Sequence, residues 1–220
     1  MQFKNLIFDF DGVLVDSEML VARSFCRYLC ERNIQFTEND FSQFAGKKTV
    51  NVISELSVKF NIDNEQGFFN DIMQIANEIY ASELTPVPGA IEFLESTAYN
   101  CFIGSNSGKE RIVSGLKKVK LDKFFAVNKV FSFDMVDKPK PEPDIYLAAI
   151  NANNLDKEET IILEDSAVGV KAGVASGVKV VGVTAGGHWY KNRPKQELLD
   201  AGAFVLIDNY NQLHIEINKL

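Results

Sequence analysis

The chain has 220 residues, of which 46% are hydrophobic and 24% charged, and its formal net charge is −7. These proportions are typical of a folded globular protein and exclude the disordered, collagen-like and membrane-embedded classes. Because nucleic acids and anionic membranes are bound through clustered lysines and arginines, the acidic balance argues against both as partners.

The cysteines and the N-terminal segment indicate where such a protein works. Cys26, Cys30 and Cys101 form no CxxC pair and are odd in number, which fits a secreted disulfide framework poorly. The first residues lack a signal-peptide pattern, and no apolar run approaches the roughly 18 residues of a membrane helix. We therefore expect reduced thiols, a cytoplasmic location and a monomer or weak homodimer.

Five short runs rich in β-branched or aromatic residues predict buried parallel strands, at 6–10, 101–104, 130–133, 160–163 and 179–183. Segments with helical apolar spacing lie between the later runs, at 110–119, 144–151 and 166–176. Such alternation predicts an α/β core with a Rossmann-like, doubly wound parallel sheet that helices cover on both faces. Sheets of this kind bind ligands at the carboxyl ends of their strands, near the point where the strand order reverses.

The interval between the first two runs contains only helical patterns, at 19–32, 50–60 and 66–83. It predicts an inserted all-helical domain of residues 15–86, between the two parts of an α/β core at 1–14 and 87–220. The polar stretch 16–18 and the Pro- and Gly-rich turn 86–89 are suited to be its hinges.

Two carboxylates, Asp9 and Asp11, lie at the end of the first predicted strand. Two like charges this close favour a bound cation, and Mg²⁺ prefers carboxylate, water and phosphate oxygens as ligands. Gly12 allows the backbone to leave the strand sharply. A solvated acidic turn is the alternative interpretation.

The next three strands also end in polar residues. Ser105 and Asn106 precede a helix and fit either an anion-binding loop or ordinary helix caps. Three prolines keep the segment 138–144 extended, so that a lysine could point at a fixed target, although a surface polyproline segment has the same composition. Glu164 and Asp165 end the fourth strand and suit either a cation or the cap of the next helix. All of them are expected at the ligand-binding edge of the sheet.

In this order the segments resemble the haloacid dehalogenase-like superfamily of aspartate-nucleophile phosphatases, and the resemblance covers nearly the whole chain. The matching motifs are DFDGVLVDSE at 9–18, GSNS at 104–107, KPEPDIY at 140–146 and LEDS at 163–166. The inserted helices resemble the small helical cap of the subgroup that includes sugar-phosphate phosphatases and β-phosphoglucomutases. The resemblance implies a Mg²⁺-dependent phosphatase. It would hydrolyse a small phosphorylated metabolite, such as a sugar or sugar-acid phosphate, through an aspartyl-phosphate intermediate.

The resemblance also implies a role for each matching residue. Asp9 would be the nucleophile, and Asp11 the general acid and base. Ser105 and the backbone N–H of Asn106 would hold phosphoryl oxygens, and Lys140 would offset negative charge on Asp9 and on the phosphoryl group. The implied Mg²⁺ ligands are Asp9, the backbone carbonyl of Asp11, Glu164 and Asp165.

Two alternatives concern the chemistry. Lys138 also fits the proline-rich motif, but Lys140 is favoured because the residues after it continue as the start of the family's helix. Haloacid dehalogenases lack an acidic residue at the position of Asp11, which favours phosphoryl transfer. A β-phosphoglucomutase-like sugar phosphate mutase is the second function considered, although that group carries a cap histidine where this chain has the segment 19–22, MLVA.

Substrate contacts are expected from the inserted domain. Gly46, Lys47 and Lys48 resemble the family's cap loop, and the lysines would contact a second anionic group or else be solvated helix-end residues. His188, after the fifth strand, would either touch the substrate or be an ordinary loop histidine.

Overall fold

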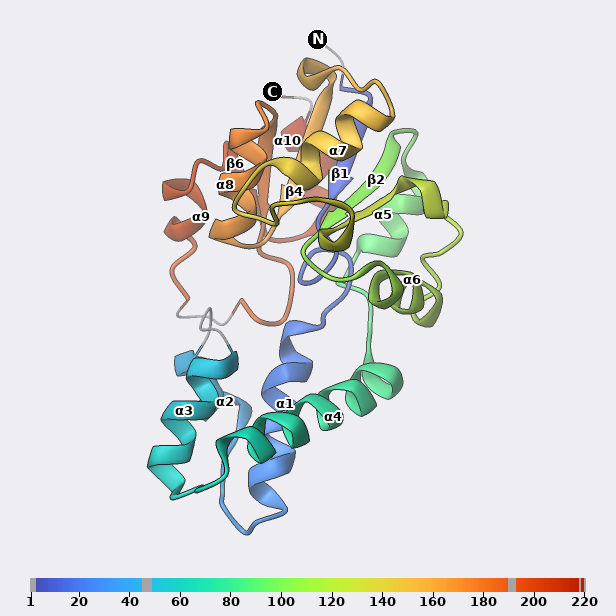
Figure 1. Ribbon diagram of the computed structural model, residues 1–220. Coiled ribbons are helices and arrows are strands. Elements are labelled where there is room, and N and C mark those ends of the chain that lie inside the picture. Colours follow the sequence, from blue (N-terminus) through green and yellow to red (C-terminus); the bar gives the residue numbers. More distant parts are fainter. Residues whose placement is uncertain (1–2, 45–48, 190–192, 218, 220) are drawn as a thin grey trace. The chain divides into compact units, whose positions relative to one another are not determined.

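The computed structural model describes residues 3–44, 49–189, 193–217 and 219. The chain divides into two compact units, one made of the residues up to Asp16 and from Thr85 onward, the other of Ser17–Leu84 (Figure 1). Val15 forms an antiparallel bridge with Pro86, so both residues belong to the first unit. The division therefore lies two residues inside each of the predicted limits, 15 and 86.

The first unit is built on a six-stranded sheet in the order β3-β2-β1-β4-β5-β6. Its strands are β1 (Asn5–Phe8), β2 (Asn100–Ser105), β3 (Val130–Ser132), β4 (Thr160–Glu164), β5 (Lys179–Val183) and β6 (Val205–Ile207). Every neighbouring pair is parallel, which confirms the doubly wound α/β fold. The strand order reverses between β1 and β4, so a ligand site is expected beyond the carboxyl ends of these two strands.

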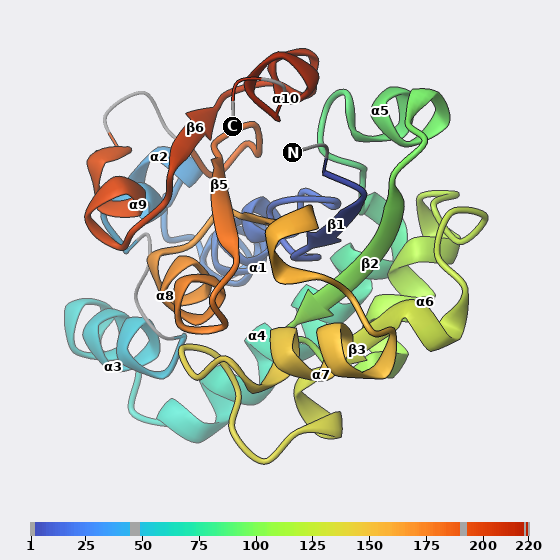
Figure 2. The ribbon, with the colours of Figure 1, turned by 90° about the horizontal axis from the view of Figure 1, so that it is seen from above.

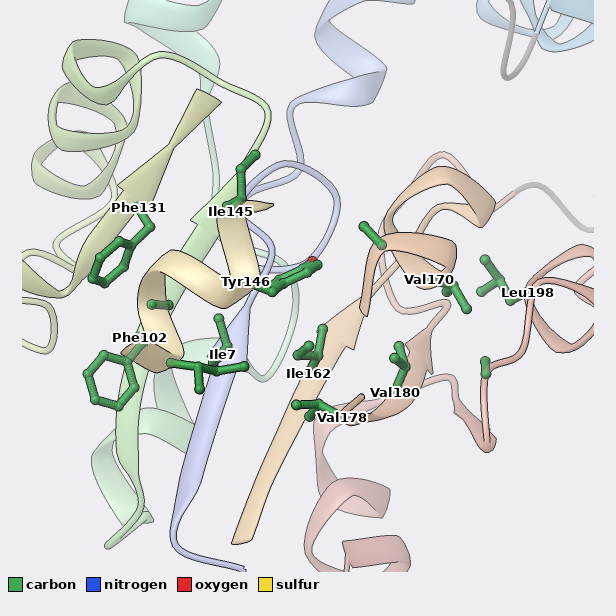
Figure 3. Packing of buried hydrophobic residues seen from close by; sticks show 14 residues of the cluster. Ile7, Phe102, Phe131, Ile145, Tyr146, Ile162, Val170, Val178, Val180 and Leu198 are labelled. Carbon is green, nitrogen blue, oxygen red and sulfur yellow. The ribbon is translucent and has the colours of Figure 1, made fainter. Parts of the chain in front are cut away.

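Helices cover both faces of this sheet, as Figure 2 shows. One face carries α5 (Ala90–Ser96), α6 (Lys109–Lys118) and α10 (Tyr210–Ile217), and the other carries α7 (Asp144–Ala152), α8 (Ala167–Ala175) and α9 (Gln196–Asp200). Figure 3 shows the apolar layer under the second set, in which Ile7, Ile162 and Val180 of the strands pack against Tyr146 and Val170 of the helices. This layer fixes the strand ends rigidly, because apolar interiors are close-packed.

Four elements of this unit have no counterpart in the predicted pattern: α5, α9, β6 and α10. Each is short, and β6 has only three residues, two of them half-buried, so its apolar pattern is too brief to distinguish from a loop. Short 3₁₀ turns complete the described elements, at Ser42–Phe44, Val127–Lys129, Phe133–Met135 and Lys157–Glu159.

The second unit is helical, with α1 (Glu18–Cys30), α2 (Glu38–Phe41), α3 (Thr49–Phe60) and α4 (Glu65–Glu83). Aromatic rings form its centre: Phe68 stacks on Tyr28 with 4.4 Å between centroids and meets Phe25 edge-on at 5.8 Å. Burial of such rings is the main source of stability for so small a unit. None of the helices described for either unit combines the length and apolar character needed to cross a bilayer.

Candidate active site

Three buried carboxylates meet where β1 and β4 end. Phe8 is paired with Leu163, so Asp9 follows β1 beside Glu164, the last residue of β4, and Asp165 comes next. One carboxylate oxygen from each of Asp9, Glu164 and Asp165 lies within 4.8 Å of the others. Parallel pairing thus brings the first and fourth sequence motifs together at the edge where the strand order reverses.

Lys140 lies among these acids. Its Nζ is 2.9 Å from Oδ1 of Asp9 and 2.6 Å from Oε1 of Glu164, and its side chain is only 3% exposed. Lys138, the other lysine of the proline-rich segment, is exposed to solvent. The structure therefore places Lys140, rather than Lys138, beside the first strand.

The side chain of Asn106 anchors the backbone of Lys140. Its Oδ1 accepts the N–H of Lys140 at 2.9 Å, and its Nδ2 donates to the carbonyl of Lys140 at 3.2 Å. This paired contact ties the loop after β2 to the proline-rich segment, so the lysine leaves a fixed backbone. The sequence offered no signal for this contact, since only the backbone N–H of Asn106 was expected to have a role.

Glu164 is completely buried and its two oxygens accept from several donors. Oε1 accepts from Lys140 and, at 2.6 Å, from the hydroxyl of Tyr146. Oε2 accepts from the N–H of Asp165 and from both the N–H and hydroxyl of Ser166, at 3.1 to 3.3 Å. Such a set of donors compensates the cost of burying a carboxylate and makes Glu164 the anchor of Lys140.

Tyr146 also stabilises the contact between Lys140 and Glu164. Burial first, and then the charge of Glu164, raise the pKa of its hydroxyl well above the ordinary value, so the proton stays on the oxygen that donates to Glu164. Nζ of Lys140 also lies 4.7 Å from the centre of the tyrosine ring, within the range of a cation–π interaction. Sequence reasoning identified Tyr146 only as part of a helix start and missed this contact.

The cluster has more negative charge than one lysine can offset. Burial raises the pKa of Asp9 to about 7, with Lys140 opposing the shift and Glu164 and Asp11 adding to it. Burial and the charge of Asp9 raise the pKa of Asp165 well above its ordinary value. Burial alone would lower the pKa of Lys140, but Asp9 and Glu164 raise it, so the lysine stays charged. An excess of negative charge of this kind favours the binding of a further cation.

Asp11 lies at the rim of the cluster and is held by two residues that follow β2. Its Oδ2 accepts from the hydroxyl of Ser107, and its Oδ1 is 3.3 Å from a guanidinium nitrogen of Arg111 on α6. The hydroxyl of Ser105, which is buried at the end of β2, in turn accepts the N–H of Ser107 at 3.2 Å. The loop after β2 and the start of α6 therefore orient Asp11, a function that sequence reasoning did not assign to Ser107 or Arg111.

The remaining residues expected to contact the substrate are His188 and the three residues of the predicted cap loop. His188 lies next to the cluster, with Nε2 2.9 Å from Oδ2 of Asp165. Gly46, Lys47 and Lys48 lie outside the described residues, so their expected contact with a substrate stays a prediction.

A comparison with known families now becomes informative. The haloacid dehalogenase-like hydrolase family matches residues 6–183, a stretch that contains all four motifs at the carboxyl edge. The chain belongs to this family. The family model reaches from β1 to β5 and includes the helical unit, which confirms the resemblance drawn from the motifs.

Individual relatives cover almost the whole chain. A phosphorylated carbohydrates phosphatase of Thermotoga maritima is 28% identical and covers 92% of this chain and 93% of its own length. The solved structure of a haloacid dehalogenase-like protein from Agrobacterium tumefaciens is 29% identical, with a TM-score of 0.87 and coverage of 99% and 98%. A second structure, a proposed β-phosphoglucomutase of Thermotoga maritima, is 25% identical, with a TM-score of 0.82 and coverage of 99% and 100%. The chain is thus an enzyme of this hydrolase family, and its relatives place it with the phosphoric monoester hydrolases.

Proposed function

We propose that this protein is a Mg²⁺-dependent phosphatase that hydrolyses a small phosphorylated metabolite, a sugar or sugar-acid phosphate, with Asp9 as the nucleophile. The observation that carries the proposal is the buried contact of Asp9 with Lys140 inside an acidic cluster. A nucleophilic carboxylate beside a fixed cation suits attack on a phosphoryl group, which needs positioning and charge compensation. In this proposal the helical unit is the cap domain that selects the metabolite.

The residues fit a magnesium ion. All three members of the cluster offer carboxylate oxygens, the ligand type that Mg²⁺ prefers, and burial, together with the neighbouring carboxylates, raises the pKa values of Asp9 and Asp165, so a bound cation would favour their ionised forms. Asp9, Asp165 and the backbone carbonyl of Asp11 would hold the ion, with Glu164 acting through water because its oxygens already accept from protein donors. A bound Mg²⁺ would supply positive charge that keeps the carboxylates ionised and balances the phosphoryl oxygens.

Two displacements at phosphorus complete the reaction. First, a carboxylate oxygen of Asp9 forms a bond to phosphorus while the bond to the substrate's alkoxide breaks, and Asp11 gives its proton to that alkoxide. Then Asp11 takes a proton from water as the water oxygen attacks phosphorus. The Asp9–phosphorus bond breaks, and inorganic phosphate and the free carboxylate are released.

Lys140, Ser105 and the N–H of Asn106 act on the phosphoryl group in both displacements. Their positive charge and hydrogen-bond donors would stabilise the negative oxygens of the transition state, and they are fixed in place before the substrate arrives. Such prior ordering is effective because no donor has to be reoriented during the reaction.

The test is phosphate release from p-nitrophenyl phosphate and from a panel of sugar phosphates and sugar-acid phosphates, with Mg²⁺ and with EDTA. We expect turnover only with the metal, and none in Asp9→Asn, which keeps the shape of the side chain but not its nucleophilic charge. Activity that survives this substitution, or that needs no metal, would sink the mechanism.

The structural likeness to a proposed β-phosphoglucomutase favours a second candidate, a sugar phosphate mutase. The two functions differ in the fate of the phosphoryl group, which a phosphatase gives to water and a mutase returns to a sugar. Conversion of a hexose 1-phosphate to the 6-phosphate in the presence of a hexose bisphosphate, followed by ³¹P NMR, would identify the mutase. Release of inorganic phosphate alone supports the phosphatase.

A further inference from the structure

His188 is a buried imidazole that contacts one member of the acidic cluster. It lies in the loop between β5 and α9, and its Nε2 is 2.9 Å from Oδ2 of Asp165. Both side chains are only 7% exposed. The contact therefore joins a third loop at the carboxyl edge of the sheet to the two that supply Asp9 and Asp165.

Two glycines leave the space that this imidazole fills. A Cβ atom on Gly12 would lie 1.9 Å from Oδ2 of Asp165 and 2.9 Å from Cε1 of His188. A Cβ atom on Gly186 would lie 2.8 Å from Nδ1 of His188 and 2.9 Å from the carbonyl oxygen of Gly12. Real side chains do not approach this closely, so any other residue at either position would displace the ring or the carboxylate. The loops after β1, β4 and β5 therefore pack closely around the contact between His188 and Asp165.

The surroundings of Asp165 explain why such a contact matters. Its carboxylate is buried beside Asp9, and burial together with the charge of Asp9 resists its ionised form. If the carboxylate of Asp165 rotated freely about its terminal bond, each binding of an ion would cost the entropy of ordering it. A ring nitrogen at 2.9 Å restricts that rotation without placing a second lysine or arginine in the cluster.

We propose that His188 is a positioning residue that holds the carboxylate of Asp165 in the orientation used to bind Mg²⁺. The inference rests on the proposed function, because it takes the cluster to be the magnesium site. Side chains that orient a metal ligand from behind commonly contribute about 10- to 100-fold to metal affinity. Ordinary core packing is the competing explanation, and it predicts a change in stability without a specific change in metal affinity.

Three substitutions of His188 separate these explanations. His188→Leu fills the space with an apolar side chain and removes the nitrogen. His188→Gln retains an N–H donor at about the reach of Nε2, and His188→Asn has a donor that is too short to reach Asp165. The matched control is His214→Leu on α10, whose ring packs 4.8 Å from that of Phe93 and lines a cavity with Lys4 and Asn100, at the opposite edge of the sheet.

The measurement is Mg²⁺ binding to the substrate-free protein by isothermal titration calorimetry, with circular dichroism in EDTA to show that each variant is folded. We expect the Mg²⁺ dissociation constant to rise about 10- to 100-fold in His188→Leu and in His188→Asn. In His188→Gln and His214→Leu it should stay close to that of the wild-type protein. The Mg²⁺ concentration for half-maximal activity should rise in parallel, whereas kcat at saturating Mg²⁺ should return to nearly the wild-type value.

The outcomes against the inference are distinct. Wild-type affinity in a folded His188→Leu or His188→Asn protein would overturn the positioning role and leave the phosphatase proposal intact. Equal losses in His188→Gln and His188→Asn would overturn it as well, and this comparison remains informative if the leucine variant does not fold. Failure of the wild-type protein itself to bind Mg²⁺ would overturn the metal site and this inference together.

Discussion

Nζ of Lys140 lies 2.9 Å from Oδ1 of Asp9, although the two residues are 131 positions apart in the chain. The same nitrogen donates to Glu164, whose other oxygen accepts from Asp165 and from Ser166, the N-cap of α8. The buried ammonium group of Lys140 thus joins the loops after β1 and β3 to the end of β4.

Replacing Lys140 by methionine should damage both stability and activity. The substitution leaves the buried carboxylates of Asp9 and Glu164 without their cation, and breaking such a buried pair costs about 3–5 kcal/mol. Turnover should fall by about 10²–10³-fold or more, the cost of removing one group that stabilises transition-state charge. Lys138→Met is the control, because Lys138 is exposed in the same segment and should show neither effect. Urea unfolding and phosphate release measure the two losses.

The raised pKa of Asp9 predicts a pH-dependent gain in stability for Asp9→Asn. Burial raises this pKa from 3.8 in an unfolded chain to about 7 in the metal-free protein. Between these values the folded state keeps a proton that the unfolded state has lost, so the wild-type protein loses stability as the pH rises through this window. Asparagine does not titrate and avoids the loss.

In EDTA at pH 8, Asp9→Asn should therefore unfold at a higher temperature than the wild-type protein, by about 2–4 °C for each kcal/mol gained. The difference should shrink toward pH 5, where the aspartate is protonated, and Mg²⁺ should reduce it at pH 8 by stabilising the wild-type protein. Asp122→Asn, at an exposed position, is the control. An equal difference at pH 5 and pH 8 would contradict this account.

Gly169→Ala should destabilise the protein, contrary to the usual effect of this change within a helix. Alanine normally favours a helix over glycine by about 1 kcal/mol. Here the added Cβ would lie 1.7 Å from Oε1 of Glu164, a side chain that is fully buried and held in place by hydrogen bonds. Such overpacking costs about 1–3 kcal/mol and would shift the carboxylate that anchors Lys140.

Thermal unfolding and turnover of Gly169→Ala should both decrease. Val168→Ala is the matched control, since Val168 lies on the exposed side of the same helix at 47% exposure. An increase in the unfolding temperature of Gly169→Ala would mean that Glu164 can move at little cost.

Arg111→Ala should lower kcat more than it lowers stability. Arg111 contacts Asp11 at 3.3 Å but is 39% exposed, and ion pairs at such positions contribute about 0–1 kcal/mol. Without it the carboxylate of Asp11 keeps the hydrogen bond from Ser107 but loses this ion pair, so a part of the roughly 10²–10⁴-fold contribution of a general acid should be lost. We expect a decrease in kcat of about tenfold by this reasoning. Lys117→Ala, an exposed change on the same helix, should leave kcat unchanged.

Much of the fold and of the candidate site follows from local patterns in the chain. Alternating strand and helix periodicities predicted the doubly wound sheet, and polar residues at the ends of four apolar runs predicted the edge where Asp9, Lys140 and Asp165 meet. This inference works because parallel strands in register must deliver their carboxyl ends to one edge of the sheet. The structure contains all five predicted strands and the three core helices predicted between the later ones.

Only the tertiary structure decided which side chains contact one another. Burial distinguishes Lys140 from Lys138 within one proline-rich segment, and α7 brings the hydroxyl of Tyr146 to Glu164. The contact of His188 with Asp165 depends on two loops that pack around glycines, and no local pattern encodes it. Periodicity reports which face of an element is buried, whereas the partner of a buried polar group is set by the close packing of elements that are distant in the sequence.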